Sequence, residues 1–183
     1  MARVKLIGTC AAAVLMGALT QIPTEPAAPG EHRLSERGYA VLIGLESCRT
    51  EPYKCSANRW TNGVGNTNNV NPNKKIDEVQ AAKDLKNNVA KFEKAVNSSV
   101  KVQIKQPVFD AMVIFSFNVG VGAFKSSTAL RELNRGHIAN ACRWLLPWNK
   151  ITVYENGKAT KAVSAGLKVR RRKEYDLCME GAK

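Results

Sequence analysis

Three residues near the start of the chain have side chains that can act on a chemical bond: Glu46, Cys55 and Thr61. Hydrolysis of a glycosidic bond needs a carboxylic acid that protonates the leaving oxygen and a second group that activates water or attacks the sugar carbon. Glu46 can supply the acid. Spacing alone leaves the alternatives open, because a glutamate at a helix end is as often a solvated charge, and a single cysteine is more often half of a disulfide than a base.

Five cysteines make an odd count, so disulfides cannot use them all. Cys142 and Cys178 lie in two helical-looking stretches, and a bond between them would contribute about 3–4 kcal/mol in the loop-entropy model. Among Cys10, Cys48 and Cys55 only one bond can form at a time. The excluded thiol can be Cys10 or Cys55, so the count allows a switch of partners. The sequence has no Cys-x-x-Cys and no ligand-like histidine pair, which argues against a metal site.

The N-terminus combines a basic start with an uncharged run, residues 6–22, and a Pro- and Gly-rich stretch, residues 23–30. At 1.5 Å per residue the run spans about 25 Å, slightly less than the roughly 30 Å hydrocarbon core of a membrane. Arg3 and Lys5 favour a cytoplasmic N-terminus and export of the body. Three interpretations compete: a cleaved secretory signal, a lipoprotein signal, and a weak, uncleaved anchor that can leave the bilayer. Cys10 favours the anchor, because a thiol inside a membrane span has no obvious anchoring role.

The elements that must position these groups form a mostly α-helical body with a small β element near its start. A helix with a possible cap at Ser35 is expected to present Glu46 at its C-terminal end. Residues 52–67 break into short strands and turns. Further helices are expected over residues 77–96, 108–120, 128–134, 138–145 and 165–180, with a turn at 120–125 and a hairpin tip or exposed loop at 154–158.

The charge balance indicates a polyanionic partner. The formal net charge is +13, from 28 Lys and Arg against 15 Asp and Glu, which suits nucleic acid, an anionic membrane face or an acidic wall polymer. The usual nucleic-acid motifs are missing from the sequence, so no nucleic-acid partner is predicted.

The motifs taken together resemble a known family. The spacing E-(8 residues)-x-(5 residues)-T is followed by N-G-V-G-N-T and later by F-S-F-N-V-G-V-G-A-F and G-L-K-V-R-R-R. This combination resembles the phage lysozyme (endolysin) family, glycoside hydrolase family 24, over residues 35–178. The resemblance implies a lysozyme-like α+β fold, predominantly α, in a catalytic domain of residues 31–183. It also implies hydrolysis of the β-1,4 bonds between N-acetylmuramic acid and N-acetylglucosamine in peptidoglycan, by a monomer without a cofactor.

Carried onto this sequence, the resemblance makes Glu46 the acid and gives Thr61 the attacking water. The family usually has Asp at the middle position, where this chain has Cys55, and Gly at the position of Ser47. An ordinary thiol with a pKa near 8.5 is only a few per cent ionised at pH 7, so Lys54 or Arg59 could be needed to activate it. Whether Cys55 acts as base or nucleophile stays open.

Asn118 and the three arginines at 170–172 can each be interpreted in two ways. Asn118, in F-N-V-G, either lines the sugar site or caps the end of a helix. The arginines at 170–172 either place one guanidinium near Glu46 or form a solvated basic helix face.

The cysteine positions are similar to those of a narrower group, the signal-arrest-release endolysins. That resemblance implies a Cys48–Cys55 bond that caps the thiol while Cys10 is in the membrane, and a Cys10–Cys48 bond after release. Residues 1–30 would then be anchor and linker in the host inner membrane, with a cytoplasmic N-terminus and a periplasmic catalytic domain that is later released. The rivals are a cysteine-dependent wall amidase or peptidase, for which neither histidine has a recognisable orienting partner, and a non-catalytic wall-binding protein.

Overall fold

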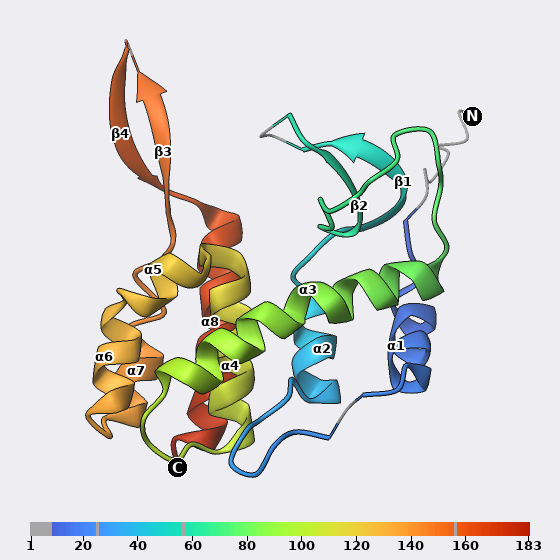
Figure 1. Cartoon of the computed structure of the whole chain (residues 1–183). Helices are drawn as coiled ribbons and strands as arrows, with labels where there is room; N and C mark the ends of the chain where they lie inside the picture. The colour runs from blue at the N-terminus through green and yellow to red at the C-terminus, as the bar shows by residue number, and fades with distance from the viewer. Residues whose placement is uncertain (1–8, 25, 56–57, 156) are drawn as a thin grey trace. The chain divides into compact units, whose positions relative to one another are not determined.

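The structure is a computed structural model that describes residues 9–24, 26–55, 58–155 and 157–183 (Figure 1). Two antiparallel hairpins stand among helices, one formed by Cys48–Lys54 and Trp60–Val64 and the other by Lys150–Glu155 and Lys158–Val163. The elements in these residues are α1 (Ala12–Gln21), α2 (Glu36–Ile43), β1 (Cys48–Lys54), β2 (Trp60–Val64), α3 (Glu78–Ser99), α4 (Gln106–Val119), α5 (Val121–Lys125), α6 (Thr128–Asn134), α7 (Ile138–Arg143), β3 (Lys150–Glu155), β4 (Lys158–Val163) and α8 (Ala165–Gly181).

Two compact units divide the chain. Unit 1 comprises the described residues up to 26 together with 39–91, and unit 2 comprises 27–38 and 92–183. Of the three boundaries, one falls within α2 and one within α3, and the third lies between α1 and α2.

The N-terminal segment is packed into unit 1. Thr9 bridges to Arg49 of β1 in antiparallel fashion, and the backbone N–H of Cys10 donates to the carbonyl of Cys48 at 3.2 Å. In α1, Leu15 and Leu19 are buried, and each buried leucine is worth about 1.5–3 kcal/mol. Lys86 of α3 donates to the carbonyl that ends this helix, at Ile22, at 2.6 Å. In this structure the segment that was expected to enter the membrane is therefore packed against the body.

None of the helices in the described part of the chain is both long and apolar enough to cross a membrane. Of the predicted anchor and linker, residues 1–30, residues 1–8 and 25 lie outside the described residues, and so does the basic start at Arg3 and Lys5.

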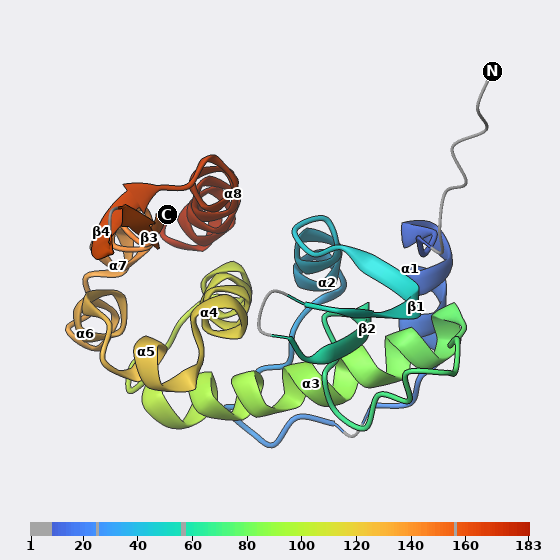
Figure 2. The same cartoon turned by 90° about the horizontal axis from the view of Figure 1, so that it is seen from above.

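Unit 2 is built around α4, whose residues from Val108 to Ser116 are all buried. Figure 2 looks along α4 and α8, and α8 lies beside α4. Cys142 of α7 and Cys178 of α8 form a disulfide, the pair expected from the sequence. The start of α2 is also fixed here: Ser35 Oγ accepts from the N–H of Gly38 at 3.0 Å, which is the predicted cap, and donates to the buried carboxylate of Asp110.

The helix boundaries agree closely with the expectations for α6, α7 and α8, and α3 and α4 start within two residues of them. One expectation was wrong: residues 121–125 form a helical turn, α5, where a turn without helix was predicted. Gly120 makes this possible because its φ of 89° lets the chain leave α4 and begin again at once.

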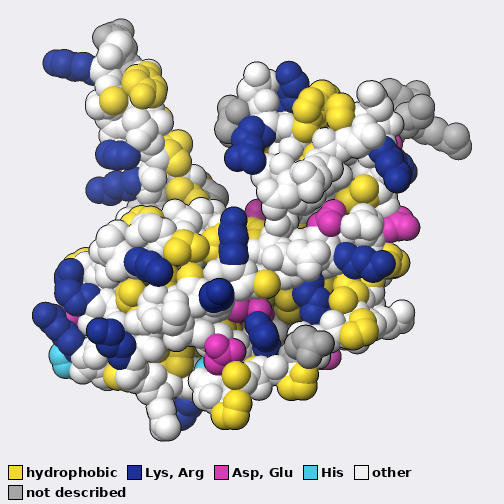
Figure 3. All heavy atoms as spheres, viewed as in Figure 1, with side chains coloured by type: hydrophobic (Ala, Val, Ile, Leu, Met, Phe, Trp, Pro, Cys, Tyr) yellow, Lys and Arg dark blue, Asp and Glu magenta, His cyan; other side chains and the backbone are white. Residues whose placement is uncertain are grey.

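The second hairpin, β3–β4, surrounds the expected tip at 154–158 and stands largely exposed. Lys150 pairs with Val163, and Lys161 pairs with Thr152, so the two lysines lie on one face. In Figure 3 basic side chains line one side of this hairpin and hydrophobic ones gather on the other.

Candidate functional site

Glu46 lies in the short connection between α2 and β1. The helix ends at Ile43, and one more turn follows, in which the N–H of Glu46 donates to the carbonyl of Leu42 at 3.1 Å. Two residues later Cys48 starts β1. The carboxylate is half-buried and is held at the helix end, as the sequence predicts.

Cys55 and Thr61 meet at one backbone carbonyl, that of Arg59. The N–H of Cys55 donates to it at 3.0 Å, and the hydroxyl of Thr61 donates to it at 3.0 Å. The two donor atoms are therefore within two hydrogen-bond lengths of each other. Thr61 is 2% exposed, and its hydroxyl proton is donated to the backbone carbonyl of Arg59. In this arrangement the hydroxyl oxygen can act toward a ligand only as an acceptor.

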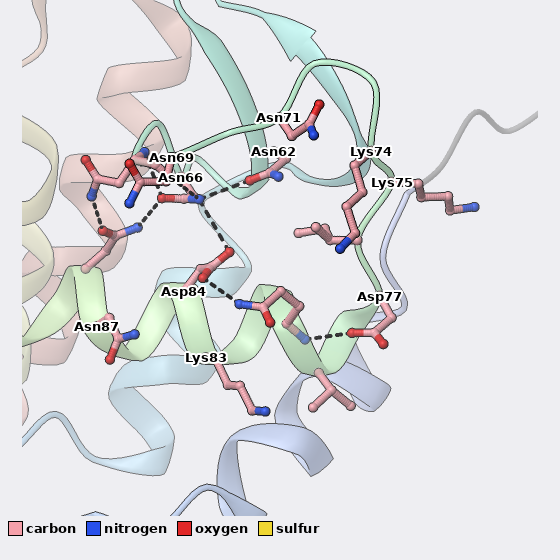
Figure 4. A pocket seen from close by; sticks show the side chains of 15 residues that line it. Asn62, Asn66, Asn69, Asn71, Lys74, Lys75, Asp77, Lys83, Asp84 and Asn87 are labelled. Atoms are coloured by element: carbon pink, nitrogen blue, oxygen red, sulfur yellow. Dashed lines mark hydrogen bonds between the residues drawn. The ribbon is translucent and has the colours of Figure 1, made fainter.

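An amide network holds the segment that follows Thr61 (Figure 4). Asn66 and Asn62 exchange two backbone hydrogen bonds, of 2.9 and 3.0 Å, and the side-chain amide of Asn66 donates to Asn62 Oδ1 at 3.1 Å and to Asp84 Oδ2 at 3.4 Å. Asn88 of α3 donates to Asn66 Oδ1 at 3.1 Å. Asn66 therefore ties β2 to α3 and limits the freedom of Thr61. A hollow of about 580 Å³ adjoins the network.

The disulfide state leaves Cys55 as a thiol. Cys10 and Cys48 are bonded, and Cys55, which is half-buried, forms no disulfide. The cations expected beside the thiol have other contacts: Lys54 lies over the ring of Trp60 at 5.6 Å, and Arg59 donates to the hydroxyl of Thr67 at 3.1 Å.

A family model with the description "Phage lysozyme" matches residues 44–174, a segment that includes Glu46, Cys55 and Thr61. The chain belongs to the phage lysozyme family. Its relatives include the SAR-endolysin of Haemophilus phage HP1, which is 35% identical over 81% of this chain and 82% of that protein.

Two solved forms of the P1 phage endolysin Lyz compare differently with this phage lysozyme. The active form matches with a TM-score of 0.78 at 26% identity, over 96% of this chain and 97% of the other. The secreted inactive form matches with a TM-score of 0.52 at 27% identity, over 82% and 98%. The structure described here is therefore more similar to the active form of Lyz than to the inactive one. In this structure Cys10 of the chain is bonded to Cys48.

The arginines of α8 correct one interpretation of the sequence. Arg170 is 6% and Arg171 is 1% exposed, so they do not belong to a solvated basic face; of the three, only Arg172 is exposed. Both buried guanidinium groups donate to Glu174 Oε1, at 3.2 Å from Arg170 and 2.7 Å from Arg171. Arg171 also donates to Asn118 Oδ1 at 2.9 Å.

Asn118, by contrast, makes no capping bond within the described residues. Its side chain accepts from Arg171, and it lines a cavity in unit 2. The buried Glu174 was missed entirely by sequence reasoning. The signal that could have found it was its spacing of three and four residues from two arginines on one helix.

Both histidines have polar partners, contrary to the sequence-based expectation. His137 Nδ1 lies 3.0 Å from Glu132 Oε2, and His32 Nδ1 lies 3.2 Å from Gln106 Oε1.

Burial raises the pKa of Glu174 to about 7, although the two arginine charges act in the opposite direction. Between its ordinary pKa of 4.5 and 7, the folded state holds a proton that the unfolded chain has released. The contribution of this group to the free energy of unfolding is therefore complete below pH 4.5 and is lost as the pH rises through 7.

The expected loss from Glu174 is about 3 kcal/mol between those limits. Urea unfolding of wild type and Glu174→Gln at pH 5 and pH 7.5 measures it, because all other carboxyl groups titrate in both proteins. Wild type should lose more stability between the two pH values than the variant does. Parallel losses in the two proteins would contradict the raised pKa.

Proposed function

We propose that this phage lysozyme is an endolysin that hydrolyses the β-1,4 bonds between N-acetylmuramic acid and N-acetylglucosamine in peptidoglycan. It is held inactive at the host inner membrane and becomes active in the periplasm by release and disulfide exchange. Residues 1–30 act as anchor and linker, and residues 31–183 act as a monomeric catalytic domain. The observation that carries the proposal is the carbonyl of Arg59, which accepts from both the backbone N–H of Cys55 and the hydroxyl of Thr61, in a structure where Cys55 forms no disulfide and Cys48 is bonded to Cys10.

The proposed chemistry divides between three residues of unit 1. Glu46 protonates the glycosidic oxygen as the bond breaks. Thr61 accepts a hydrogen bond from the attacking water, because its own proton is already donated to Arg59. Cys55, as the thiolate, either removes a proton from that water or attacks the sugar carbon. The net charge of +13 favours adsorption to the anionic wall.

The proposed activation is a thiol–disulfide exchange that needs no outside oxidant. The Cys10 thiolate attacks the sulfur of Cys48, the Cys48–Cys55 bond breaks, and Cys55 leaves as the thiolate. The backbone bridge between residues 9–10 and β1 supports this proposal, because it places Cys10 beside Cys48.

The locked form must differ in β1 as well as in its sulfur atoms. Cys48 at one end of β1 pairs with Val64, and Lys54 at the other end pairs with Trp60. Since Trp60 and Val64 are four residues apart on β2, the Cα atoms of Cys48 and Lys54 are separated by about 13 Å. A disulfide needs Cα atoms closer than about 7 Å. A Cys48–Cys55 bond therefore excludes this hairpin, and with it the position of Thr61, so the lock would disable two catalytic residues together.

The test of the proposed function is the chemical nature of the products from purified peptidoglycan sacculi. Glycan hydrolysis produces new reducing sugar ends, an amidase or peptidase produces new amino groups, and a wall-binding protein produces neither. We expect reducing ends from the enzyme that has Cys10 bonded to Cys48. Alkylation with iodoacetamide, which reaches only Cys55 when both disulfides are intact, should abolish them. New amino groups without reducing ends would favour the rival enzyme.

A further inference from the structure

The side-chain amide of Asn118 has a fixed orientation. Arg171 Nη2 donates to Asn118 Oδ1 at 2.9 Å, and a guanidinium group has donors only, so the oxygen must face Arg171. The Nδ2 donor must then face the other way. Among the described residues, no protein group accepts a hydrogen bond from it, and Asn118 itself is exposed.

Arg171 is well placed to hold that orientation because it cannot move easily. Its guanidinium is 1% exposed and lies over the ring of Phe115, 5.1 Å from the centroid. The same Nη2 that reaches Asn118 also donates to Glu174 Oε1 at 2.7 Å. Glu174 is completely buried. A chain of contacts therefore runs from a buried carboxyl group to an exposed amide.

The exposed end of this chain lies at a cavity of about 590 Å³ within unit 2. A cavity of this size accommodates a sugar-sized group, and its aromatic and polar lining suits a ligand with both apolar and hydroxyl-bearing faces. Besides Asn118, the residues that line it include Trp144, Trp148, Lys150 and Lys161.

We propose that Arg171 and Glu174 are positioning residues, which fix the amide of Asn118 so that its Nδ2 donates a hydrogen bond to an acceptor oxygen of the wall polymer in this cavity. The proposal rests on the proposed function, since it takes peptidoglycan as the ligand. It makes Asn118 a donor toward substrate, and it gives the buried Arg171–Glu174 contact a role in substrate binding.

Asn118→Asp tests the donor. Aspartate keeps the oxygen that accepts from Arg171 and replaces the Nδ2 donor with a second acceptor, so the fold should persist. We expect KM for sacculi to rise about tenfold, with kcat changed less than twofold. The matched control is Asn140→Asp, because Asn140 is also exposed and accepts from an arginine, Arg143, at 2.9 Å. The control measures the effect of added negative charge and should leave KM unchanged.

Arg171→Lys tests the positioning role through a double-mutant cycle. Lysine keeps the charge beside Glu174 but cannot hold the amide in a fixed plane. KM should rise about fivefold in the wild-type background and stay constant in the Asn118→Asp background, where no donor remains to be oriented. If Arg171→Lys does not fold, Glu174→Gln serves in the same cycle.

The outcomes separate this proposal from the proposed function. Absence of reducing ends from wild-type enzyme would refute the function itself. If wild type produces them, an Asn118→Asp KM within twofold of the Asn140→Asp value refutes the donor. Equal KM increases from Arg171→Lys in both backgrounds refute positioning and leave Arg171 a structural residue.

Discussion

Glu46→Gln is expected to lower the rate of peptidoglycan hydrolysis by about 10²–10⁴-fold while the protein still folds. The amide has the shape of the acid but has no proton to give to the glycosidic oxygen. Glutamine can still take the place of Glu46 at the end of α2, since the backbone bond to Leu42 does not involve the side chain. Release of reducing ends from sacculi measures the rate, and circular dichroism checks the fold.

The control for this variant is Glu51→Gln, which removes the same charge from an exposed position on β1. It should hydrolyse sacculi at the wild-type rate, because Glu51 has no part in the proposed chemistry. The two variants lose the same charge and differ only in its position. Rates for Glu46→Gln within a few-fold of wild type would remove Glu46 from the role of acid.

Much of the fold could be predicted from local pattern. The apolar stretch that becomes α4 and the capped start of α2 at Ser35 are visible in the sequence, because periodicity and capping act over a few residues. The partner of Ser35 is not visible in this way. Its hydroxyl also contacts Asp110, 75 residues away, and only the folded chain brings the two together.

The arginines of α8 show where sequence reasoning fails. A run of three arginines on a polar helix is typical of a solvated face, and Arg172 fits that pattern. Arg170 and Arg171 do not, because Glu174 supplies a buried carboxyl group that both can reach from the same helix. Whether a charged side chain is buried depends on the element that packs against its helix, here α4 against α8. The spacing of residues along one helix does not predict that packing.

The composition of the N-terminal uncharged run, residues 6–22, suits both a membrane and the surface of a protein. Marginal hydrophobicity weakens a membrane anchor, and the same residues can cover a protein surface. In the structure Leu15 and Leu19 are buried, while Val14 remains 53% exposed. Composition predicted the weak anchor, but the docking site beside β1 depends on Lys86 and on the hairpin.

Cys10→Ser is expected to be exported and released normally but to show no lysis above background. Without the Cys10 thiolate nothing displaces Cys55 from Cys48, and the serine hydroxyl cannot attack a disulfide. The Cys48–Cys55 bond then keeps the ends of β1 too close for the β1–β2 pairing, in which Cys48 faces Val64 and Lys54 faces Trp60. The variant should therefore lack both the thiol and the placed Thr61.

A mild reductant should restore lysis by this variant, because reduction of Cys48–Cys55 returns the thiol and allows the hairpin to form. The Cys142–Cys178 disulfide must survive the treatment. Both cysteines are 0% exposed, so the reductant reaches this bond poorly. Mass spectrometry of the disulfides before and after reductant verifies which bond has opened.

The decisive measurement is lysis after artificial depolarisation of the membrane, with and without reductant. In wild type we expect release to bring Cys10 into the compartment of Cys48, where its tether would give it a high effective concentration, so lysis should need no reductant. Cys10→Ser should lyse only with reductant, and the Cys10→Ser, Cys48→Ser double variant should lyse without it, since Cys55 then has no partner to cap it. Full activity of Cys10→Ser without reductant would show that Cys10 is not the trigger, and the bond between Cys10 and Cys48 would then only fasten the N-terminal segment to β1.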